Sequence, residues 1–247
     1  AYLRTQKMPI VIKADGLAAG KGVVICQTLE EAEATVKEML LDRKFDDASS
    51  KIVIEEFLDG EEFSLMAFVS NEIYKAMPIA RDYKRAHDGD LGLNTGGMGN
   101  HSPHPLIFDT DYEDAINQVI EPMTKAMIEE GIPFTGILYA GLMKTAEGIK
   151  VIEFNARFGD PETEVLLPRL ETDLTDIMLS LLEGKDIECH WNDKATVGIV
   201  LAAKGYPGAY VKGTPIKGLD ELVDVDVCHM GTKLIDNQIS LNGGRVL

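Results

Sequence analysis

The chain has 247 residues, of which 45% are hydrophobic and 26% charged, and its formal net charge is −17. This composition is typical of a globular protein, and the negative charge argues against a general nucleic-acid partner without forbidding a small anionic ligand. The sequence contains no apolar stretch near the length of a membrane span, no signal peptide and no cysteine pattern typical of disulfides or metal sites. We therefore expect a cytoplasmic protein of one or two domains without a membrane partner.

The first predicted element is a strand at residues 10–12, a short β-branched run that Lys13 follows. A glycine-rich stretch at 16–22 and a second β-branched run at 23–25 come next. Glycines let backbone N–H groups approach phosphate oxygens, but the spacing differs from that of a P-loop and no helix is expected behind it. The pattern predicts a hairpin flap that closes over a nucleotide, with an ordinary glycine-rich hairpin as the alternative.

The following elements alternate between helical and extended patterns. Thr28 and Glu31 form a capping box that predicts a helix start. Further helices are expected at 111–130 and at 173–183, where Gly184 ends the second one. Strands are expected at 52–57, 63–69, 73–78, 136–145 and 149–158, and short strands with Gly and Pro turns from residue 195 onward. The chain therefore reads as α+β, with a domain boundary near residue 190.

Two segments between these elements are candidates for ligand binding. Residues 55–62 carry several carboxylates after a strand, where free backbone groups suit an adenine edge and a carboxylate suits ribose hydroxyls. The alternative for this segment is a charged hairpin turn. Residues 83–105 read as a long glycine-rich loop, and loops of this length are functional or disordered. Within that region, the short run 94–99 and the charged residues before it could contact a phosphate.

Residues 151–164 are the most informative stretch. Because side chains alternate along a strand, Glu153, Asn155 and Arg157 are expected on one face and apolar residues on the other. Mg²⁺ takes one or two oxygen ligands from protein and the rest from phosphate and water. This row therefore suits a metal-bridged polyphosphate, with a solvated polar face as the alternative. The sequence shows no nucleophile elbow and no Cys–His pair.

Taken together, these segments resemble those of the phosphoribosylamine–glycine ligases, a family of the ATP-grasp superfamily. The resemblance rests on the order and spacing of residues 13–22, 55–62, 94–99, 139–143, 153–163, 205–208 and 242–246. It implies an ATP-grasp lid at 1–58, a central domain at 59–190 and part of a mostly β C-terminal domain at 191–247. The family's N-terminal domain is expected to be absent, and the chain, which begins without Met, is expected to be a fragment.

The resemblance also implies residue roles at matching positions. ATP-binding residues would be Lys13, Gly20, Lys21, Gly22, Glu55, Glu56, Phe57, Leu58 and Glu62. Substrate-binding residues would be Asp82, Lys84, Arg85, Asn94, Thr95, Gly96, Gly97, Met98 and Gly99. Glu153 and Asn155 would bind the metal, and Arg157, Asp160 and Glu162 would face the reacting groups. Glu164 stands where the family usually has Gln and adds a negative charge near the site.

The implied activity is ATP-dependent ligation of glycine to phosphoribosylamine through glycyl phosphate, with Mg²⁺ or Mn²⁺ as cofactor. Such chemistry depends on positioning and charge neutralisation, which agrees with the absence of an evident protein nucleophile. Two alternatives remain. One is another ATP-grasp ligase with a different carboxylate and amine, and the other is a nucleotide-binding module without ligase activity.

Overall fold

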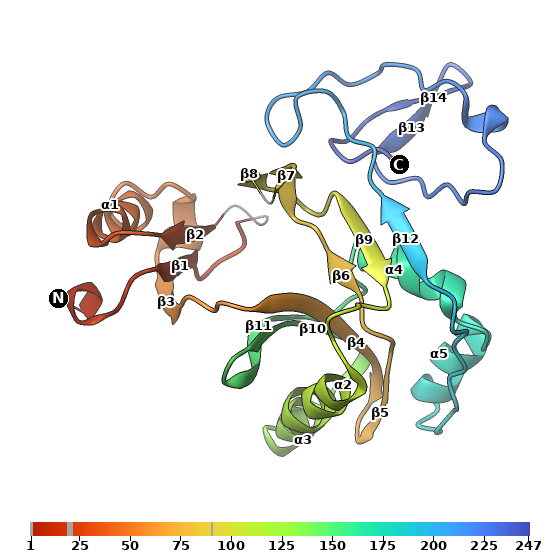
Figure 1. The fold of residues 1–247 in the computed structure, drawn as a ribbon, viewed down its shortest axis with the longest axis horizontal. Coiled ribbons are helices and arrows are strands. Elements are labelled where there is room, and N and C mark those ends of the chain that lie inside the picture. The colour runs from red at the N-terminus through yellow and green to blue at the C-terminus, as the bar shows by residue number, and fades with distance from the viewer. Residues whose placement is uncertain (1, 19–21, 90) are drawn as a thin grey trace. The chain divides into compact units, whose positions relative to one another are not determined.

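The computed structural model describes residues 2–18, 22–89 and 91–247. It divides into two compact units, Ala1–Asp59 and Gly60–Leu247. Each unit has a hydrophobic core of its own, so each is described by itself. The elements are labelled along the chain in Figure 1. Among the described residues, no helix combines the length and the apolar character that a membrane crossing requires.

The first unit is a small antiparallel sheet with a helix packed on it. Its strands, in the order β2–β1–β3, are β2 Val23–Cys26, β1 Ile10–Ala14 and β3 Ile52–Glu56. The helix is α1 Leu29–Leu40, and the short turns η1 Tyr2–Thr5 and η2 Asp46–Ser49 complete the unit. Ile10 and Ile12 face Cys26 and Met39 in the core. The hairpin predicted around residues 10–25 is confirmed.

The start of α1 follows the predicted cap with one difference. The Thr28 hydroxyl accepts a hydrogen bond from the Glu31 amide at 3.2 Å, as a helix N-cap does. The Glu31 carboxylate accepts from the Gln27 amide at 2.7 Å, one residue before the position that a capping box uses. Both bonds satisfy donors at the helix entrance, so the predicted start is correct.

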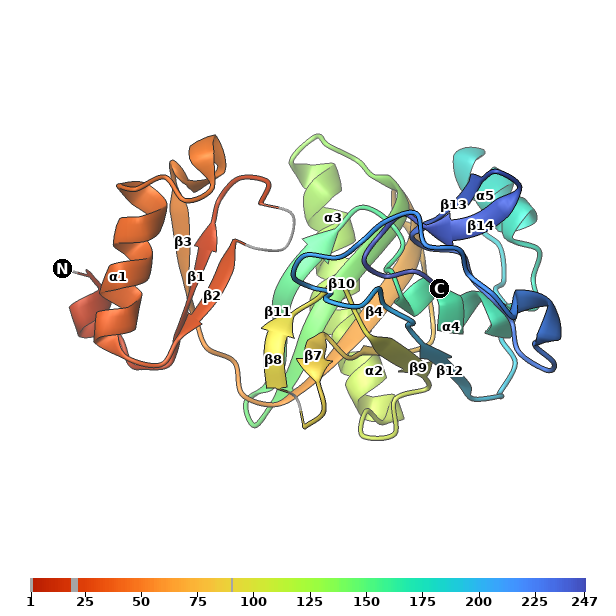
Figure 2. The same ribbon diagram turned by 90° about the horizontal axis from the view of Figure 1, so that it is seen from above.

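The second unit is built on an antiparallel sheet with helices on both faces. Its strand order is β11–β10–β4–β5, with β11 Gly148–Asn155, β10 Thr135–Thr145, β4 Glu61–Ser70 and β5 Ile73–Ala76. Alternate side chains of β4 enter different cores, because Phe63 and Leu65 pack toward α2 and α3 while Met66 and Phe68 pack toward α4 and α5. Figures 1 and 2 show these helix pairs on opposite sides of the sheet.

The helices of the second unit lie where the sequence predicts them, but the long one is not a regular α-helix. The helix expected at 111–130 is α2 Asp109–Ala115, a π turn η3 Ile116–Ile120 and α3 Glu121–Glu129. The change of register lies just before Pro122, whose nitrogen cannot donate to the preceding turn. The remaining helices are α4 Glu162–Leu166, η4 Leu167–Arg169 and α5 Leu174–Leu182. The helix predicted at 173–183 is α5, and the Asp173 side chain caps its start.

The prediction of a long loop at 83–105 is wrong. This region contains β7 Arg85–His87, β8 Leu91–Asn94 and β9 Gly99–Ser102, preceded by β6 Arg81–Asp82. β9 is the middle strand of a sheet ordered β12–β9–β6, and its partner β12 Thr196–Ile199 is distant in sequence. Glycine-rich sequence has low strand propensity, but non-local pairing overrides it here.

The C-terminal region is extended, as expected from residue 195 onward. Beyond β12 it contains a short turn η5 Leu219–Glu221 and a hairpin of β13 Thr232–Ile235 and β14 Gln238–Leu241. Backbone hydrogen bonds join residues 201–203 to residues 244–247. The last residues of the chain therefore run beside the segment that follows β12, while the division expected near residue 190 stays a prediction.

Candidate functional site

In the first unit, the predicted phosphate contact lies on the hairpin. Lys13 is the fourth residue of β1, and its ammonium group lies 2.5 Å from a carboxylate oxygen of Glu55 on β3. Gly22 lies beside the same strand, because its carbonyl accepts from the Ala14 amide at 2.8 Å. Two further predicted residues of this hairpin, Gly20 and Lys21, lie outside the described residues.

The expected adenine hinge lies at the end of β3. The strand ends at Glu56 rather than at the predicted Phe57. Phe57 and Leu58 therefore leave the sheet, and in the described part of the chain their backbone groups have no backbone hydrogen bond. Free N–H and C=O groups next to a strand are what recognition of a base edge requires.

In the second unit, the strand register brings the predicted metal ligands onto a polar sheet face. Tyr139 pairs with Asn155 on one side and Met66 on the other, while Gly141 pairs with Glu153 and Ser64. Cross-strand neighbours share a face, so the side chains of Glu153 and Asn155 lie on the same face as Tyr139 and Ser64. Figure 2 shows β11, β10 and β4 side by side.

Glu153 and Asn155 lie close to each other. Arg157 contacts Asn155 from beyond the end of the strand and not, as predicted, as its next residue on the same face. The Asn155 amide donates to Glu153 at 3.4 Å, and Arg157 donates to the Asn155 amide oxygen at 3.4 Å. However, β11 ends at Asn155, so Arg157 does not continue the strand. Phe158, expected on the opposite face, packs against Phe68 in the core on the Tyr139 side. The strict alternation through residue 158 is therefore wrong, because the chain turns after Asn155.

Glu162 lies at the buried centre of this face. It is 2% exposed, and one oxygen accepts from the Ser64 hydroxyl at 2.7 Å and from the Tyr139 hydroxyl at 2.9 Å. Two donors stabilise the buried carboxylate. Burial, and then the charge of Glu162, raises the pKa of Tyr139, which keeps that donor protonated. Ser64 and Tyr139 were not predicted as site residues, and their only signal is a polar group inside an apolar strand.

Asp82 and Lys84 reach the same face from the segment at and after β6. Lys84 forms an ion pair with Glu62, so the structure joins a predicted phosphate contact to the predicted ribose carboxylate. Burial lowers the pKa of Lys84, but Glu62 and then Asp82 outweigh it and raise the pKa. Asp82 is 8% exposed and its Oδ1 has no hydrogen-bond partner among the described residues. Burial, and then Glu162, raises the pKa of Asp82 to about 8.

The glycine-rich segment, residues 94–99, is hydrogen-bonded to the backbone of Lys84. The amide and the hydroxyl of Thr95 both donate to the Lys84 carbonyl, at 2.7 and 2.8 Å. Gly97 has φ +119°, and a Cβ there would lie 2.5 Å from Asp82 Oδ1 and 2.4 Å from Pro161 Cδ. Glycine is therefore required at this position.

The remaining predicted residues of this region lie differently. The Met98 amide donates to the Tyr83 carbonyl, and Gly99 begins β9. Arg85 donates instead to the Gly92 carbonyl at 2.9 Å on the β7–β8 hairpin, and Asn94 is exposed at the end of β8. The structure therefore does not bring Arg85 and Asn94 to the Glu162 centre through any hydrogen bond or ion pair of the described residues.

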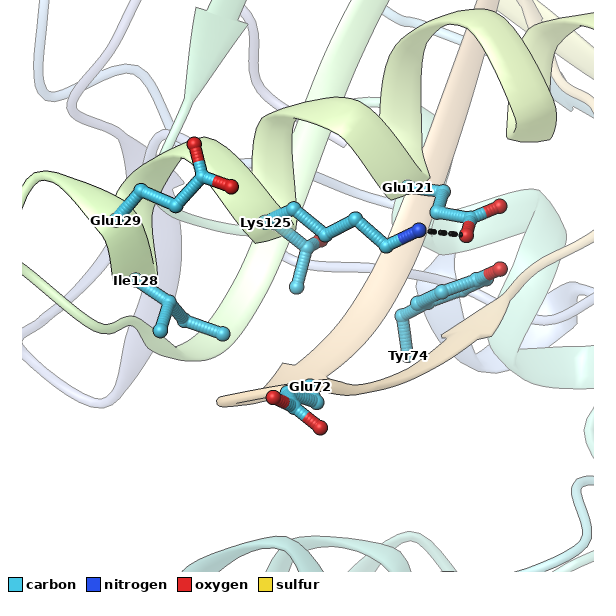
Figure 3. A pocket seen from close by; sticks show the side chains of 7 residues that line it. Glu72, Tyr74, Glu121, Lys125, Ile128 and Glu129 are labelled. Atoms are coloured by element: carbon cyan, nitrogen blue, oxygen red, sulfur yellow. Dashed lines mark hydrogen bonds and ion pairs between the residues drawn. The ribbon is translucent and has the colours of Figure 1, made fainter.

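A groove of about 420 Å³ lies elsewhere in the second unit, between β5 and α3 (Figure 3). Glu72, Tyr74 and Lys125 line it, and Lys125 pairs with Glu121. It contains none of the candidate site residues, so we place the candidate site on the polar sheet face and not in this groove. Among the described residues, no cluster of three His, Cys, Asp or Glu side chains forms a metal site by itself. A metal at Glu153 and Asn155 would need oxygen ligands from phosphate and water.

Comparison with known proteins agrees with this geometry. Residues 1–163 match the family profile described as phosphoribosylglycinamide synthetase, ATP-grasp (A) domain, and residues 196–247 match the C domain of the same synthetase. The structure of phosphoribosylamine–glycine ligase from Thermotoga maritima superposes with a TM-score of 0.89 and 35% identity, covering 99% of this chain and 61% of that one. Biotin carboxylase from Campylobacter jejuni, at 13% identity and a TM-score of 0.67 over 98% of this chain and 53% of its own, shares the fold. The fold is therefore the ATP-grasp fold.

Curated relatives share sequence along the whole chain. The phosphoribosylamine–glycine ligases of Halalkalibacterium halodurans and Listeria monocytogenes are 55% and 53% identical over 100% of this chain. The chain belongs to the phosphoribosylglycinamide synthetase family. It spans 58% and 60% of the length of these two relatives. The family and fold expected from the sequence are confirmed.

Proposed function

We propose that the protein to which this chain belongs is an ATP-dependent ligase that joins glycine to 5-phosphoribosylamine and forms glycinamide ribonucleotide, ADP and phosphate. The observation that carries the proposal is the sequence identity of 55% and 53% with two phosphoribosylamine–glycine ligases along 100% of this chain. The polar sheet face supports it, because Glu153, Asn155 and Glu162 lie together there on paired strands and the turn that follows.

The metal role belongs to Glu153 and Asn155. The face also carries the carboxylates of Glu62 and Glu162 beside Glu153, so a bound cation would offset their charge toward a polyphosphate. Glu153 is exposed and Asn155 half-buried, so both oxygens are accessible. They fit Mg²⁺ or Mn²⁺, which would supply positive charge to offset that of the phosphates.

Candidate ATP-binding residues are present in each unit, considered separately. Lys13, Gly20, Lys21 and Gly22 would contact phosphates, residues 55–58 the adenine, and Glu62 the ribose. Lys13 is paired with Glu55 and Glu62 with Lys84, so each carboxylate holds a lysine in a defined position. Exchange of the Lys13–Glu55 pair for a contact with nucleotide would place Lys13 on phosphate.

The chemistry would proceed in two steps. An oxygen of the glycine carboxylate attacks the γ-phosphorus of ATP, the bond to the bridging oxygen breaks, and ADP leaves. The amine of phosphoribosylamine then attacks the carbonyl carbon of glycyl phosphate, the C–O bond breaks, phosphate leaves with the electron pair, and the nitrogen loses a proton to the departing phosphate. Arg157 would offset charge on the transferred group, and Asp160 and Glu162 would orient the amines. The substrate residues would be Asp82, Lys84, Arg85 and 94–99. The rate acceleration would come from the positioning of the reactants and from electrostatic stabilisation of the transition state.

The test is a steady-state assay of the complete gene product. Release of ADP should require both glycine and phosphoribosylamine, and mass spectrometry should detect glycinamide ribonucleotide. ADP release that ignores glycine but requires another carboxylate would indicate a different ATP-grasp ligase. ATP binding without any turnover would indicate a nucleotide-binding module.

A further inference from the structure

Two side chains of the C-terminal region converge on one residue of the glycine-rich segment, Gly96, and bind its backbone N–H and C=O groups. Arg245 Nη1 donates to the Gly96 carbonyl at 2.9 Å, and the Gly96 amide donates to the Tyr206 hydroxyl at 3.1 Å. These partners lie 149 and 110 positions further along the chain. Both backbone polar groups of Gly96 are therefore held by tertiary contacts rather than by the segment itself.

The same nitrogen of Arg245 also reaches the turn that leads into Glu162. It donates to the Asp160 carbonyl at 3.1 Å and to an Asp160 carboxylate oxygen at 2.8 Å. The Arg245 side chain is 19% exposed and the Asp160 side chain 53% exposed, so this charge-assisted contact is partly open to water. Arg245 thus ties the glycine-rich segment to the turn that carries Asp160 and Glu162.

The glycines around this contact permit it. A Cβ at Gly96 would lie 2.8 Å from the Arg245 guanidinium carbon, and a Cβ at Gly244 would lie 2.2 Å from the Tyr206 ring. Both distances are too short for a real side chain. One glycine belongs to the segment 94–99 and the other to the segment 242–246, so two separate sequence motifs meet at this point.

The backbone holds the two C-terminal side chains together. Ala202 pairs with Arg245, the Ala203 amide donates to the Gly244 carbonyl at 2.7 Å, and the Val246 amide donates to Leu201 at 2.9 Å. Tyr206 and Arg245 therefore belong to two backbone segments that are hydrogen-bonded to each other. Side chains on a backbone that is already ordered lose little further conformational entropy when they bind a loop.

The carboxylates around Arg245 explain why the side chain that binds the Gly96 carbonyl is a cation. Arg245 contacts Asp160 and acts through its charge on Asp82 and Glu164. Burial raises the pKa of Glu164, with Asp160 and Glu162 adding to it, and Arg245 opposes this shift. The guanidinium therefore offsets the repulsion among the carboxylates of this turn.

We propose that Arg245 and Tyr206 are positioning residues of the ligase site. They hold the backbone N–H and C=O groups of Gly96, so that the glycine-rich segment keeps its place against Asp160 and the start of α4 at Glu162. This inference rests on the proposed function. Neither residue is assigned a contact with reacting atoms, so their loss should weaken use of the amine substrate and leave ATP binding unchanged. A misplaced loop is costly in rate even when all chemical groups remain.

The test compares Tyr206→Phe and Arg245→Lys in the complete gene product with two matched controls. Tyr210→Phe removes a hydroxyl that has no hydrogen bond among the described residues, on a ring that contacts Tyr206. Lys233→Ala removes an exposed cation of β13. We expect kcat/KM for phosphoribosylamine to fall about tenfold in Tyr206→Phe and about 100-fold in Arg245→Lys. The dissociation constant for ATP should not change.

Hydrogen–deuterium exchange provides a readout that does not depend on turnover. Backbone amides of residues 96–98 should exchange faster in both variants and at the wild-type rate in both controls. Unchanged exchange there, or an equal loss of ATP affinity and of protection throughout the unit, would overturn the positioning role. If Arg245→Lys does not fold, Tyr206→Phe decides alone. If the wild type makes no product, the proposed function fails, and the exchange rates still show whether these residues hold the segment.

Discussion

The β1–β2 hairpin of the first unit and the polar sheet face of the second are built in different ways. In the first unit, Lys13 lies on β1, Gly22 directly precedes β2 of the same hairpin, and Glu55 lies on β3. In the second, Ser64, Tyr139 and Glu162 meet although the Ser64–Glu162 contact spans 98 positions. A local site depends on short-range sequence and is partly exposed, whereas an assembled site depends on the register of several strands. Substitutions should therefore act locally in the first and cooperatively in the second.

The largest effect should come from Glu153→Gln. The substitution keeps the shape of the side chain and removes a charged oxygen from a metal site with few protein ligands. We expect kcat to fall by at least about 100-fold at saturating Mg²⁺, with the thermal unfolding curve unchanged because Glu153 is exposed. Glu147→Gln, on the exposed β10–β11 turn, is the matched control. Near-wild-type turnover of Glu153→Gln would remove the metal assignment.

Tyr139→Phe tests whether the buried network stabilises the second unit. The change deletes one of two hydroxyl donors to the carboxylate of Glu162, which is 2% exposed. Loss of a hydrogen bond to a buried charge should lower the free energy of unfolding by about 1–3 kcal/mol. Denaturant titration measures it, and Ser64→Ala with the double variant gives the coupling. Strict additivity of the two single changes would show that the network does not act as a unit.

Lys13→Met tests the local site. The variant keeps the length of the stem and removes the charge that pairs with Glu55. We expect the dissociation constant for ATP·Mg²⁺ to rise about tenfold, which is about 1.4 kcal/mol, with little change in the stability of the second unit. Calorimetry measures it, with Lys51→Met, an exposed residue before β3, as control. Equal affinities of both variants would argue against a phosphate contact at Lys13.

Asp82 gives the second unit a pH dependence. Its pKa in the folded protein is about 8, above the value of about 4 for an unfolded chain. The folded state therefore binds this proton more tightly, so the contribution to stability is present at acidic pH and is lost as pH rises from about 4 to about 8. The slope should be at most about 1.4 kcal/mol per pH unit.

Asp82→Asn should remove that slope, because the amide resembles the protonated acid and does not titrate. Thermal unfolding between pH 5 and pH 9, expressed as the difference from wild type, measures the effect. Asp236→Asn, on the exposed β13–β14 turn, should run parallel to wild type. Parallel curves for Asp82→Asn as well would mean that Asp82 is ionised in the folded protein.

Much of the fold could be predicted from local sequence. β-branched runs at 10–12 and 23–25 became a hairpin, Thr28 and Asp173 capped helices, and Gly184 has the left-handed φ of +67° that ends α5. These features depend on neighbours within a few residues, whose preferences are written in the local pattern. The row at 153–157 predicted two residues on one face correctly. The predicted strand was wrong beyond Asn155, because nothing local marks where a strand leaves its sheet, although Arg157 still donates a hydrogen bond to Asn155.

By itself, the sequence determined the class of fold and the family, and it supplied most side chains of the candidate site as predictions. Only the tertiary structure decided that β9 is a central strand, that Ser64 and Tyr139 hold Glu162, and that Tyr206 and Arg245 hold Gly96. The physical reason is the same in each case. These contacts join residues far apart in the chain, and their free energy comes from strand register, burial and charge in the folded state rather than from the preferences of any one segment.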